Sequence, residues 1–345
     1  MKKNLLSGWV AILLMCCTLL PSTARSQRNI LRIIFETDIG NDVDDALAMD
    51  MIYKYLDAGR IKLLAVNSNK DSRYSTEYIH LLNCWYGYPA VPIGKVVHGA
   101  ESESDARKYA EHVCLMKDDN GKELFPRPAF SYDALPDAVQ LYRKILADQK
   151  DGAVTIVSVG FSTNLVRLLQ SGPDEFSRLS GKELIARKVR LLSVMAGSFG
   201  EKKIAEYNVV KDIPAARILA QSWPTPIVYT PFEAGIAVKY PGRVIEHDFT
   251  WAPHHPVVEA YKYYLPMPYD RPTWDLIALL YAVENKPAYF TRSDWGDMSV
   301  DEKGFTHFSP SQGGRRAYLT LSPEQASNVL ARFVQLTTLK PKAFK

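Results

Sequence analysis

Four aspartates, Asp38, Asp42, Asp44 and Asp45, lie within eight residues of the sequence, shortly after a mostly apolar run at 30–35. Like charges this close repel one another, and they are usually tolerated near a cation, at a helix N-terminus or in open water. A helix cap needs only one acidic residue, whereas this loop has four. Carboxylate oxygens are typical ligands of Ca²⁺ or Mg²⁺, and the absence of neighbouring histidine or cysteine disfavours Zn²⁺. The loop therefore predicts a site for a hard divalent cation.

Apolar runs of strand length alternate with helix-like segments along the rest of the chain. We predict strands at 30–35, 61–66, 153–159, 189–195 and 226–229, and helices at 44–58, 76–85, 164–170, 213–221 and 274–283. Continuous apolar strands separated by helices predict an α/β fold, in which a mostly parallel central sheet carries helices on both faces in a Rossmann-like arrangement. Ligands bind such sheets at the carboxyl ends of the strands, which is where the aspartate loop falls.

The first 26 residues have the pattern of an export signal. Lys2 and Lys3 precede an uncharged, mostly apolar run at 5–20, and the small residues Ala24 and Ser26 suit cleavage after Ser26. We therefore expect the mature chain to be periplasmic or secreted.

A lipidated cysteine is an alternative interpretation of this segment. It would use Cys16 or Cys17, but Met15 is larger than the residue that usually precedes a lipidated cysteine. The other two cysteines, Cys84 and Cys114, could pair in an oxidising compartment.

Removal of the signal leaves residues 27–345, which we predict to form one catalytic domain. The signal carries three basic residues and no acid, so the formal charge falls from +4 to +1. A nearly neutral chain without a basic block gives no electrostatic reason to bind nucleic acid or an anionic membrane. No later apolar run is long enough to span a bilayer.

The aspartate loop, ETDIGNDVDD at 36–45, resembles the Asp-x-Asp-x-x-x-Asp-Asp signature of the nucleoside hydrolases, the calcium-dependent N-ribohydrolases. Four later segments resemble this family in the same order: SVGFSTNLVRLL (158–169), VMAGS (194–198), AEYNVVKDIPAARIL (205–219) and RPTWDLIALLYAV (271–283). The chain departs from the signature in two ways. Glu36 stands at the position of the first aspartate, and the loop is two residues longer.

The resemblance implies a nucleoside-hydrolase-like fold and a bound Ca²⁺. The ion would be held by the carboxylates of Asp38, Asp45 and Asp275 and by a backbone carbonyl, which we assign to Val159. The implied reaction is hydrolysis of the N-glycosidic bond of ribonucleosides by a calcium-bound water, with Asp38 as general base. The resemblance also suggests a homo-oligomer, either a dimer or a tetramer.

Further residues are implied to bind the substrate. By similarity, Asp44, Glu206, Asn208 and Asp275 would bind the ribose, and Met195 would pack close to it.

Three residues are candidates for assisting the departure of the base. Trp274 occupies the position where some relatives have a histidine acid; it could stack on the base or pack in the core. His254 and His255 are alternative acids, although a solvent-exposed histidine pair is the more usual case.

The expected sugar contacts differ from the family pattern after the second strand. The family usually has Gly-Asn there, whereas this chain reads VNSNKDSRYS at 66–75. Asn69, Asp71 or Ser72 could substitute, while Lys70 would bring a charge near the sugar. These changes keep two alternatives open: a hydrolase of a different riboside and an exported riboside- or nucleoside-binding protein.

A separate alternative is an Asp-x-Asp phosphotransferase of the haloacid dehalogenase type, which also has acids after its first strand. Glu36 would then occupy the position of the nucleophile, and Asp44 and Asp45 would have no role.

Overall fold

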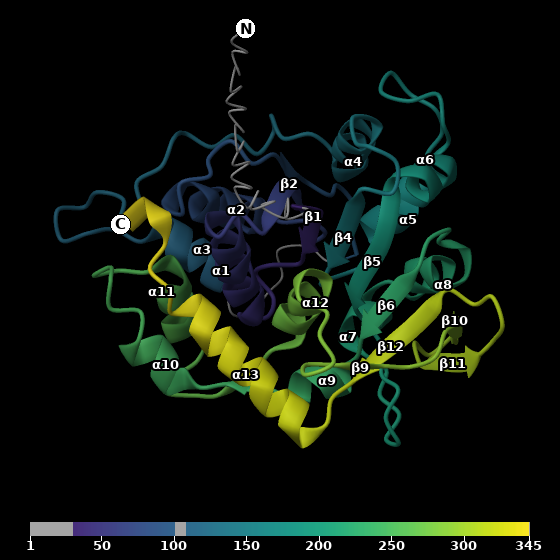
Figure 1. Ribbon diagram of the computed structural model, residues 1–345. Helices are drawn as coiled ribbons and strands as arrows, with labels where there is room; N and C mark the ends of the chain where they lie inside the picture. The colour runs from purple at the N-terminus through teal and green to yellow at the C-terminus, as the bar shows by residue number, and fades with distance from the viewer. Residues whose placement is uncertain (1–29, 101–107, 345) are drawn as a thin grey trace, which may run out of the picture.

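A ten-stranded sheet forms the centre of the computed structural model, which describes residues 30–100 and 108–344 (Figure 1). The export segment predicted at residues 1–26 lies outside the described residues. The strand order is β11-β10-β12-β6-β5-β4-β1-β2-β3, with β9 beside β12. The parallel strands are β1 (Leu31–Thr37), β2 (Ile61–Ser68), β3 (Ile93–Gly94), β4 (Val154–Ser158), β5 (Val189–Met195), β6 (Ile227–Thr230) and β12 (Arg316–Thr320).

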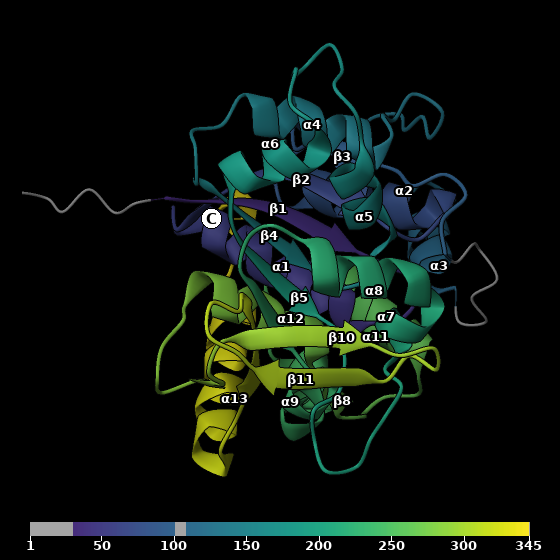
Figure 2. The same cartoon turned by 90° about the vertical axis from the view of Figure 1, so that its right-hand side faces the viewer.

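Antiparallel strands extend one end of this sheet. They are β9 (Thr291–Arg292), β10 (Gly296–Val300) and β11 (Thr306–Pro310), and Figure 2 shows β10 and β11 side by side. Two short strands, β7 (Lys239–Tyr240) and β8 (Arg271–Pro272), form a separate pair.

Helices cover both faces of the sheet, and each face has its own hydrophobic core. One core includes residues of α1 (Asp44–Asp57), α2 (Arg73–Trp85), α3 (Tyr109–Leu115), α9 (Phe232–Ala237), α10 (Gly242–His247), α11 (Pro256–Tyr264), α12 (Trp274–Val283) and α13 (Pro323–Thr337). The other includes residues of α4 (Ala138–Ala147), α5 (Thr163–Gln170), α6 (Gly181–Lys188), α7 (Tyr207–Lys211) and α8 (Ile213–Ser222). Both views place α4 and α6 on the opposite side of the sheet from α13 (Figures 1 and 2).

The strand β1 shows why three consecutive residues in its middle, 33–35, are all apolar. Successive side chains of a strand point to opposite faces, so Ile33 and Phe35 belong to one core and Ile34 to the other. All three side chains are fully buried. This confirms the α/β fold predicted from the sequence, with a mostly parallel sheet covered on both faces.

The predicted elements agree with the structure to within three residues at their ends. The bounds of β5 and α12 are those predicted. Strands β9 to β12 were not predicted from the sequence, although β10 has a regular alternation of buried and exposed residues.

The carboxyl ends of β1, β4, β5 and β6 meet at one edge of the sheet. Residues 38, 159, 196 and 231 follow these strands directly, so chain segments far apart in sequence lie together there. None of the helices in the described ranges has the length and apolar character needed to cross a membrane. Cys84 and Cys114 both carry free thiols.

Candidate active site

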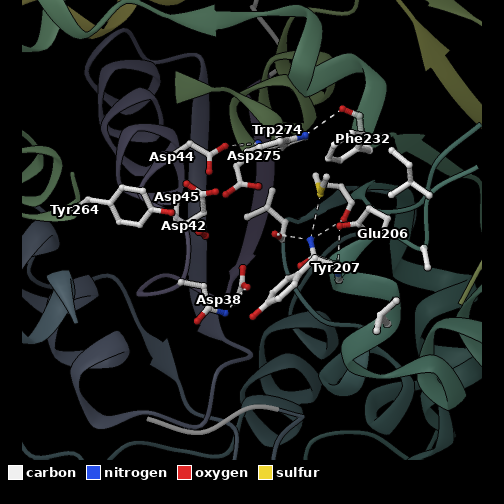
Figure 3. A pocket seen from close by; sticks show the side chains of 17 residues that line it. Asp38, Asp42, Asp44, Asp45, Glu206, Tyr207, Phe232, Tyr264, Trp274 and Asp275 are labelled. Carbon is white, nitrogen blue, oxygen red and sulfur yellow. Dashed lines mark hydrogen bonds between the residues drawn. The ribbon is translucent and has the colours of Figure 1, made fainter. Parts of the chain in front are cut away.

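A cavity of about 650 Å³ opens at this edge of the sheet (Figure 3). All the site residues predicted from the sequence line it: Asp38, Asp44, Asp45, Val159, Met195, Glu206, Asn208, Trp274 and Asp275. They come from three kinds of position: the loop after β1, the ends of β4 and β5, and the starts of α1, α7 and α12. Glu206 is the residue just before α7. The structure thus brings every predicted site residue to one place.

Three of the aspartates form a tight cluster. Asp44, Asp45 and Asp275 are buried, and each has a carboxylate oxygen within 4.8 Å of an oxygen of the other two. The Asp275 backbone N–H donates to Asp44 Oδ2 at 3.1 Å, and the hydroxyl of Thr37 donates to Asp45. Because α1 and α12 both begin at this cluster, two helix N-termini direct partial positive charge toward it.

The negative charges of the clustered aspartates repel one another and are poorly solvated. Burial and the carboxylates of Asp44 and Asp45 raise the pKa of Asp275 well above its ordinary value. Burial also raises the pKa of Asp45 and of Asp44, reinforced by neighbouring aspartates. Asp44 Oδ1 is buried and has no hydrogen-bond partner among the described residues. A buried group of hard oxygen donors with an unpartnered oxygen fits a divalent metal ion.

Asp38 lines the same cavity but lies apart from this trio. Its Oδ2 accepts a hydrogen bond of 2.8 Å from Asn41 Nδ2. Asp38, Asp45 and Asp275 were predicted as the metal ligands, whereas the carboxylates that approach one another within 4.8 Å among the described residues are those of Asp44, Asp45 and Asp275. In Figure 3, Asp38 lies beside the cluster and on the same side of the cavity.

Asn208 joins the ends of two strands at the floor of the cavity. Its Nδ2 lies 3.2 Å from the carbonyl oxygens of Val159 and Met195 and 3.2 Å from Met195 Sδ. The side chain therefore fixes the carbonyl that the sequence analysis assigned to the metal.

Glu206 is the N-cap of α7. Its carboxylate accepts backbone hydrogen bonds from Gly197, Asn208 and Val209 at 2.9–3.3 Å. Burial raises the pKa of Glu206 to about 7, although these three donors act in the opposite direction. Figure 3 shows Glu206 and Tyr207 across the cavity from the aspartate cluster.

The contacts of Trp274 favour core packing over base stacking, the two interpretations left open above. Its Nε1 donates to the Phe232 carbonyl at 3.1 Å, and the two rings stack with centroids 5.8 Å apart. The ring also packs closely on Gly235, and the Arg271 guanidinium lies 5.4 Å from the ring centroid. Only part of the ring is left to line the cavity.

Several cavity residues were not predicted as site residues. They are Asn41, Asp42, Ile204, Ala205, Tyr207, Val210, Phe232 and Tyr264. Asp42 forms an ion pair with Arg271, which also donates to the Tyr264 hydroxyl at 3.2 Å. The position of Phe232 just after β6 is a sequence signal that could have identified it, because strand ends share this edge. No comparable signal marks Tyr264.

None of the described histidines lines the cavity. His255 is buried, in contrast to the exposed pair considered above, and its Nδ1 accepts from the Val257 backbone at the start of α11. Burial lowers the pKa of His255 well below its ordinary value. His254 is exposed and lies 3.7 Å from Glu259. Neither histidine is positioned as a general acid.

The loop after β2 contributes no residue to the cavity lining. Ser72 caps α2, and the carboxylate of Asp71 faces the Gly99 backbone and the Tyr132 hydroxyl. Asn69 lies close to Asp38, because a Cβ built on Gly160 would lie 2.4 Å from Asn69 Oδ1 and 2.8 Å from Asp38 Oδ1. Asn69 is therefore the best placed of the three residues considered as substitutes for the family asparagine.

Glu36, at the position of the first signature aspartate, is fully buried outside the cavity lining. The hydroxyl of Tyr142 donates to it at 2.6 Å, and burial raises the pKa of Glu36 to about 7. A phosphotransferase of the haloacid dehalogenase type would need its nucleophile at this position, open to substrate. The burial of Glu36 argues against that alternative.

The fold and the site define an α/β protein with a candidate divalent-cation site at the carboxyl edge of a parallel sheet. Residues 33–330 match the family of inosine-uridine preferring nucleoside hydrolases, and the chain belongs to this family. The family resemblance inferred from the five sequence segments is thereby confirmed.

Particular relatives support the same family. Over 126 residues the chain is 33% identical to the pyrimidine-specific ribonucleoside hydrolase RihA of Enterobacter sp. (strain 638). That alignment covers 36% of this chain and 35% of the relative, so the chain matches about a third of the relative's length.

Two solved structures are similar in fold. The purine-preferring ribonucleoside hydrolase from Gardnerella vaginalis has a TM-score of 0.66 at 15% identity, with 89% of this chain and 99% of that chain covered. The inosine-uridine preferring nucleoside hydrolase from Bacillus anthracis has a TM-score of 0.66 at 14% identity, with 90% and 99% covered.

Proposed function

We propose that this protein hydrolyses the N-glycosidic bond of ribonucleosides, releasing the base and ribose. The observation that carries this proposal is the convergence of Asp38, the aspartate cluster, Glu206 and Asn208 on one cavity in a chain of this family. The cavity combines acidic groups on one side with aromatic side chains, a combination that suits a polar sugar joined to a flat base.

We propose calcium as the metal, because the donor set suits a hard divalent cation and the family resemblance implies calcium. The carboxylates of Asp38, Asp45 and Asp275 and the Val159 carbonyl would hold it, since these are hard oxygen donors with no nitrogen or sulfur ligand among them. When bound there, the ion would acidify the attacking water and bind hydroxyl groups of the sugar.

Asp38 would act as the general base. Its carboxylate would take a proton from the attacking water while the water oxygen forms a bond to the anomeric carbon. The bond from that carbon to the base nitrogen breaks, and its electron pair leaves with the base. The transition state resembles an oxocarbenium ion, as in other glycoside hydrolyses.

The remaining cavity residues would position the substrate. Asp44, Glu206 and Asn208, together with Asp275, would bind the ribose hydroxyls, and Met195 would pack against the ring. Tyr207, Phe232 and Tyr264 would provide aromatic surface for the base.

Release of free base from a panel of purine and pyrimidine ribonucleosides tests the proposal. We expect calcium to support release, EDTA to abolish it, and Asp38→Asn to lower kcat by roughly 10²- to 10⁴-fold. The panel would also determine the base preference, for which the relatives offer both a pyrimidine-specific and a purine-preferring example. Binding of nucleosides without release would support the alternative of a riboside-binding protein.

We also propose that the mature protein is exported and forms a homo-oligomer. The pattern of residues 1–26 supports export, and the family resemblance supports a dimer or tetramer. Mass analysis of the protein secreted from an expressing cell would test the cleavage after Ser26, and light scattering would give the oligomeric state.

A further inference from the structure

Lys70 is a buried lysine next to the aspartate loop, although it does not line the cavity. Its side chain donates from Nζ to Asn41 Oδ1 at 2.5 Å. The ammonium lies close to Gly40 of the loop, because a Cβ added at that residue would lie 3.7 Å from Nζ. Burying a charged group costs considerable free energy unless it is paired or hydrogen-bonded.

The contact with Lys70 determines which way the Asn41 amide faces. An ammonium group can only donate hydrogen bonds, so it must face the amide oxygen. The amide nitrogen is then directed to Asp38, and it donates to Oδ2 at 2.8 Å. Hydrogen bonds to charged groups in a buried setting are stronger than those in water.

The loop backbone is held separately from these side chains. The Tyr109 hydroxyl accepts from the Gly40 backbone N–H and donates to the Asp42 carbonyl, both at 2.8 Å. The orientation of the Asp38 carboxylate thus depends on Asn41 in addition to the backbone of the loop.

The two partners lie at two places where this chain departs from the family pattern. Asn41 lies in the loop that is two residues longer than the signature, and Lys70 lies in the segment that replaces the usual Gly-Asn. The hydrogen bond between them connects the two departures.

We propose that Lys70 is a positioning residue for Asp38 and that it acts through Asn41. Lys70 orients the Asn41 amide, and Asn41 holds one oxygen of Asp38, so that the two contacts together set the orientation of the Asp38 carboxylate in the cavity. This inference rests on the proposed function, in which Asp38 is both metal ligand and general base.

Four variants test this inference: Lys70→Met, Asn41→Ala, the double variant and Lys70→Arg. Lys70→Met and Asn41→Ala should each lower kcat by roughly tenfold, with KM within about twofold, and should weaken calcium binding in calorimetry by a similar factor. The double variant should be no worse than either single variant, because both remove the same interaction. Lys70→Arg keeps a donor and should recover most of kcat, since a space of about 90 Å³ adjoins the lysine.

A matched control is Lys62→Met, which makes the same substitution at an exposed lysine of β2 and should leave kcat and calcium affinity unchanged. Circular dichroism of every variant checks the fold. Additive losses in the double variant, an unchanged Lys70→Met, or an arginine variant as impaired as the methionine variant would each overturn the inference.

The two proposals fail in different ways. If the wild-type protein binds calcium but releases no base from any nucleoside, the proposed function fails and the calcium affinities of the variants decide the role of Lys70. A wild-type protein that neither binds calcium nor releases base overturns both.

Discussion

Gly160 follows Val159 at the end of β4, where two side chains of the site approach the backbone closely. A Cβ at this position would lie 2.8 Å from Asp38 Oδ1 and from Asn69 Nδ2, and it would overlap Asn69 Oδ1. Real Cβ atoms do not approach polar atoms this closely, so one or both side chains would have to move. The absence of a side chain at Gly160 thus allows Asp38 and Asn69 to lie together.

We predict that Gly160→Ala lowers kcat/KM for the best nucleoside by at least about tenfold, because a displacement of about 1 Å at a reacting group has effects of this size or larger. The measurement is steady-state base release at saturating calcium. Gly172→Ala is the matched control, since an added Cβ there meets no atom within 4 Å. Equal activity of the two variants would show that the contacts at Gly160 do not position the site.

Residue types and a position just after a strand were enough to predict the aspartate loop as a cation site, whereas the other site residues were assigned from the resemblance to the family. Asp38, Val159 and Met195 lie at or just after the ends of β1, β4 and β5, and the ends of parallel strands share an edge. The contacts of Lys70 with Asn41 and of Arg271 with Asp42 were not predictable. The two residues of each contact are 29 and 229 positions apart in the sequence. Such contacts depend on the direction of the side chains, which sequence spacing does not determine.

At the scale of elements, α1 carries polar side chains into one of the cores. Asp50 is fully buried; it accepts from the hydroxyl of Tyr86, the residue just after α2, and lies 3.4 Å from Lys54 on the next turn. His255 Nε2 is 4.0 Å away. Burial raises the pKa of Asp50 from 3.8 to about 6, although Lys54 and Tyr86 lower it.

This raised pKa predicts a dependence of stability on pH. The folded state keeps the proton on Asp50 to higher pH than the unfolded state, so the stability this group contributes is present below pH 4 and is lost as the pH rises through 6. The interval from 3.8 to about 6 corresponds to roughly 3 kcal/mol.

Urea unfolding of the wild type and Asp50→Asn at pH 4 to 7 measures this contribution. Between pH 4 and 7 the wild type should lose roughly 2–3 kcal/mol of stability through ionisation of Asp50, and the variant has no carboxyl group there to ionise. The free energy of unfolding of the variant minus that of the wild type should therefore rise by this amount. Asp119→Asn, at an exposed position, should show a constant difference. A constant difference for Asp50→Asn would contradict the prediction.

Elements were predictable where their sequence is mostly apolar, as in β5 and α12. The short strands β9 to β12 were not, because they are five residues or fewer and partly exposed. Their pairing is set by neighbours such as β6, whose Ile227 pairs with Arg316 of β12. A strand that extends the end of a sheet needs little apolar sequence, so its pattern is weak.

At the scale of the whole molecule, the aspartate cluster joins two helices that are far apart in the chain. Asp44 and Asp45 begin α1 near the start of the described chain, and Asp275 begins α12 some 230 residues later. Their mutual repulsion opposes the packing of α1 against α12. A cation at the cluster would remove this repulsion, so we expect metal binding to stabilise the whole fold in addition to serving the reaction.

We predict that calcium raises the melting temperature and that EDTA lowers it. A ligand that binds only the folded state stabilises it by about 2.7 kcal/mol at 100 times its Kd, which for a chain of this size corresponds to a rise of about 5 °C. Thermal unfolding monitored by circular dichroism, at several calcium concentrations, measures the effect without any need for substrate.

Two variants define the source of the shift. Asp45→Asn removes a ligand and part of the repulsion, so its melting temperature without metal should equal or exceed that of the wild type and should respond little to calcium. Asp119→Asn, far from the cluster in sequence and exposed, should respond to calcium as the wild type does. If Asp45→Asn kept the full calcium response, the stabilising ion would bind elsewhere. If the wild type melted at the same temperature in calcium and in EDTA, the cluster would not be a calcium site, because an ion that binds the folded state selectively must raise its stability.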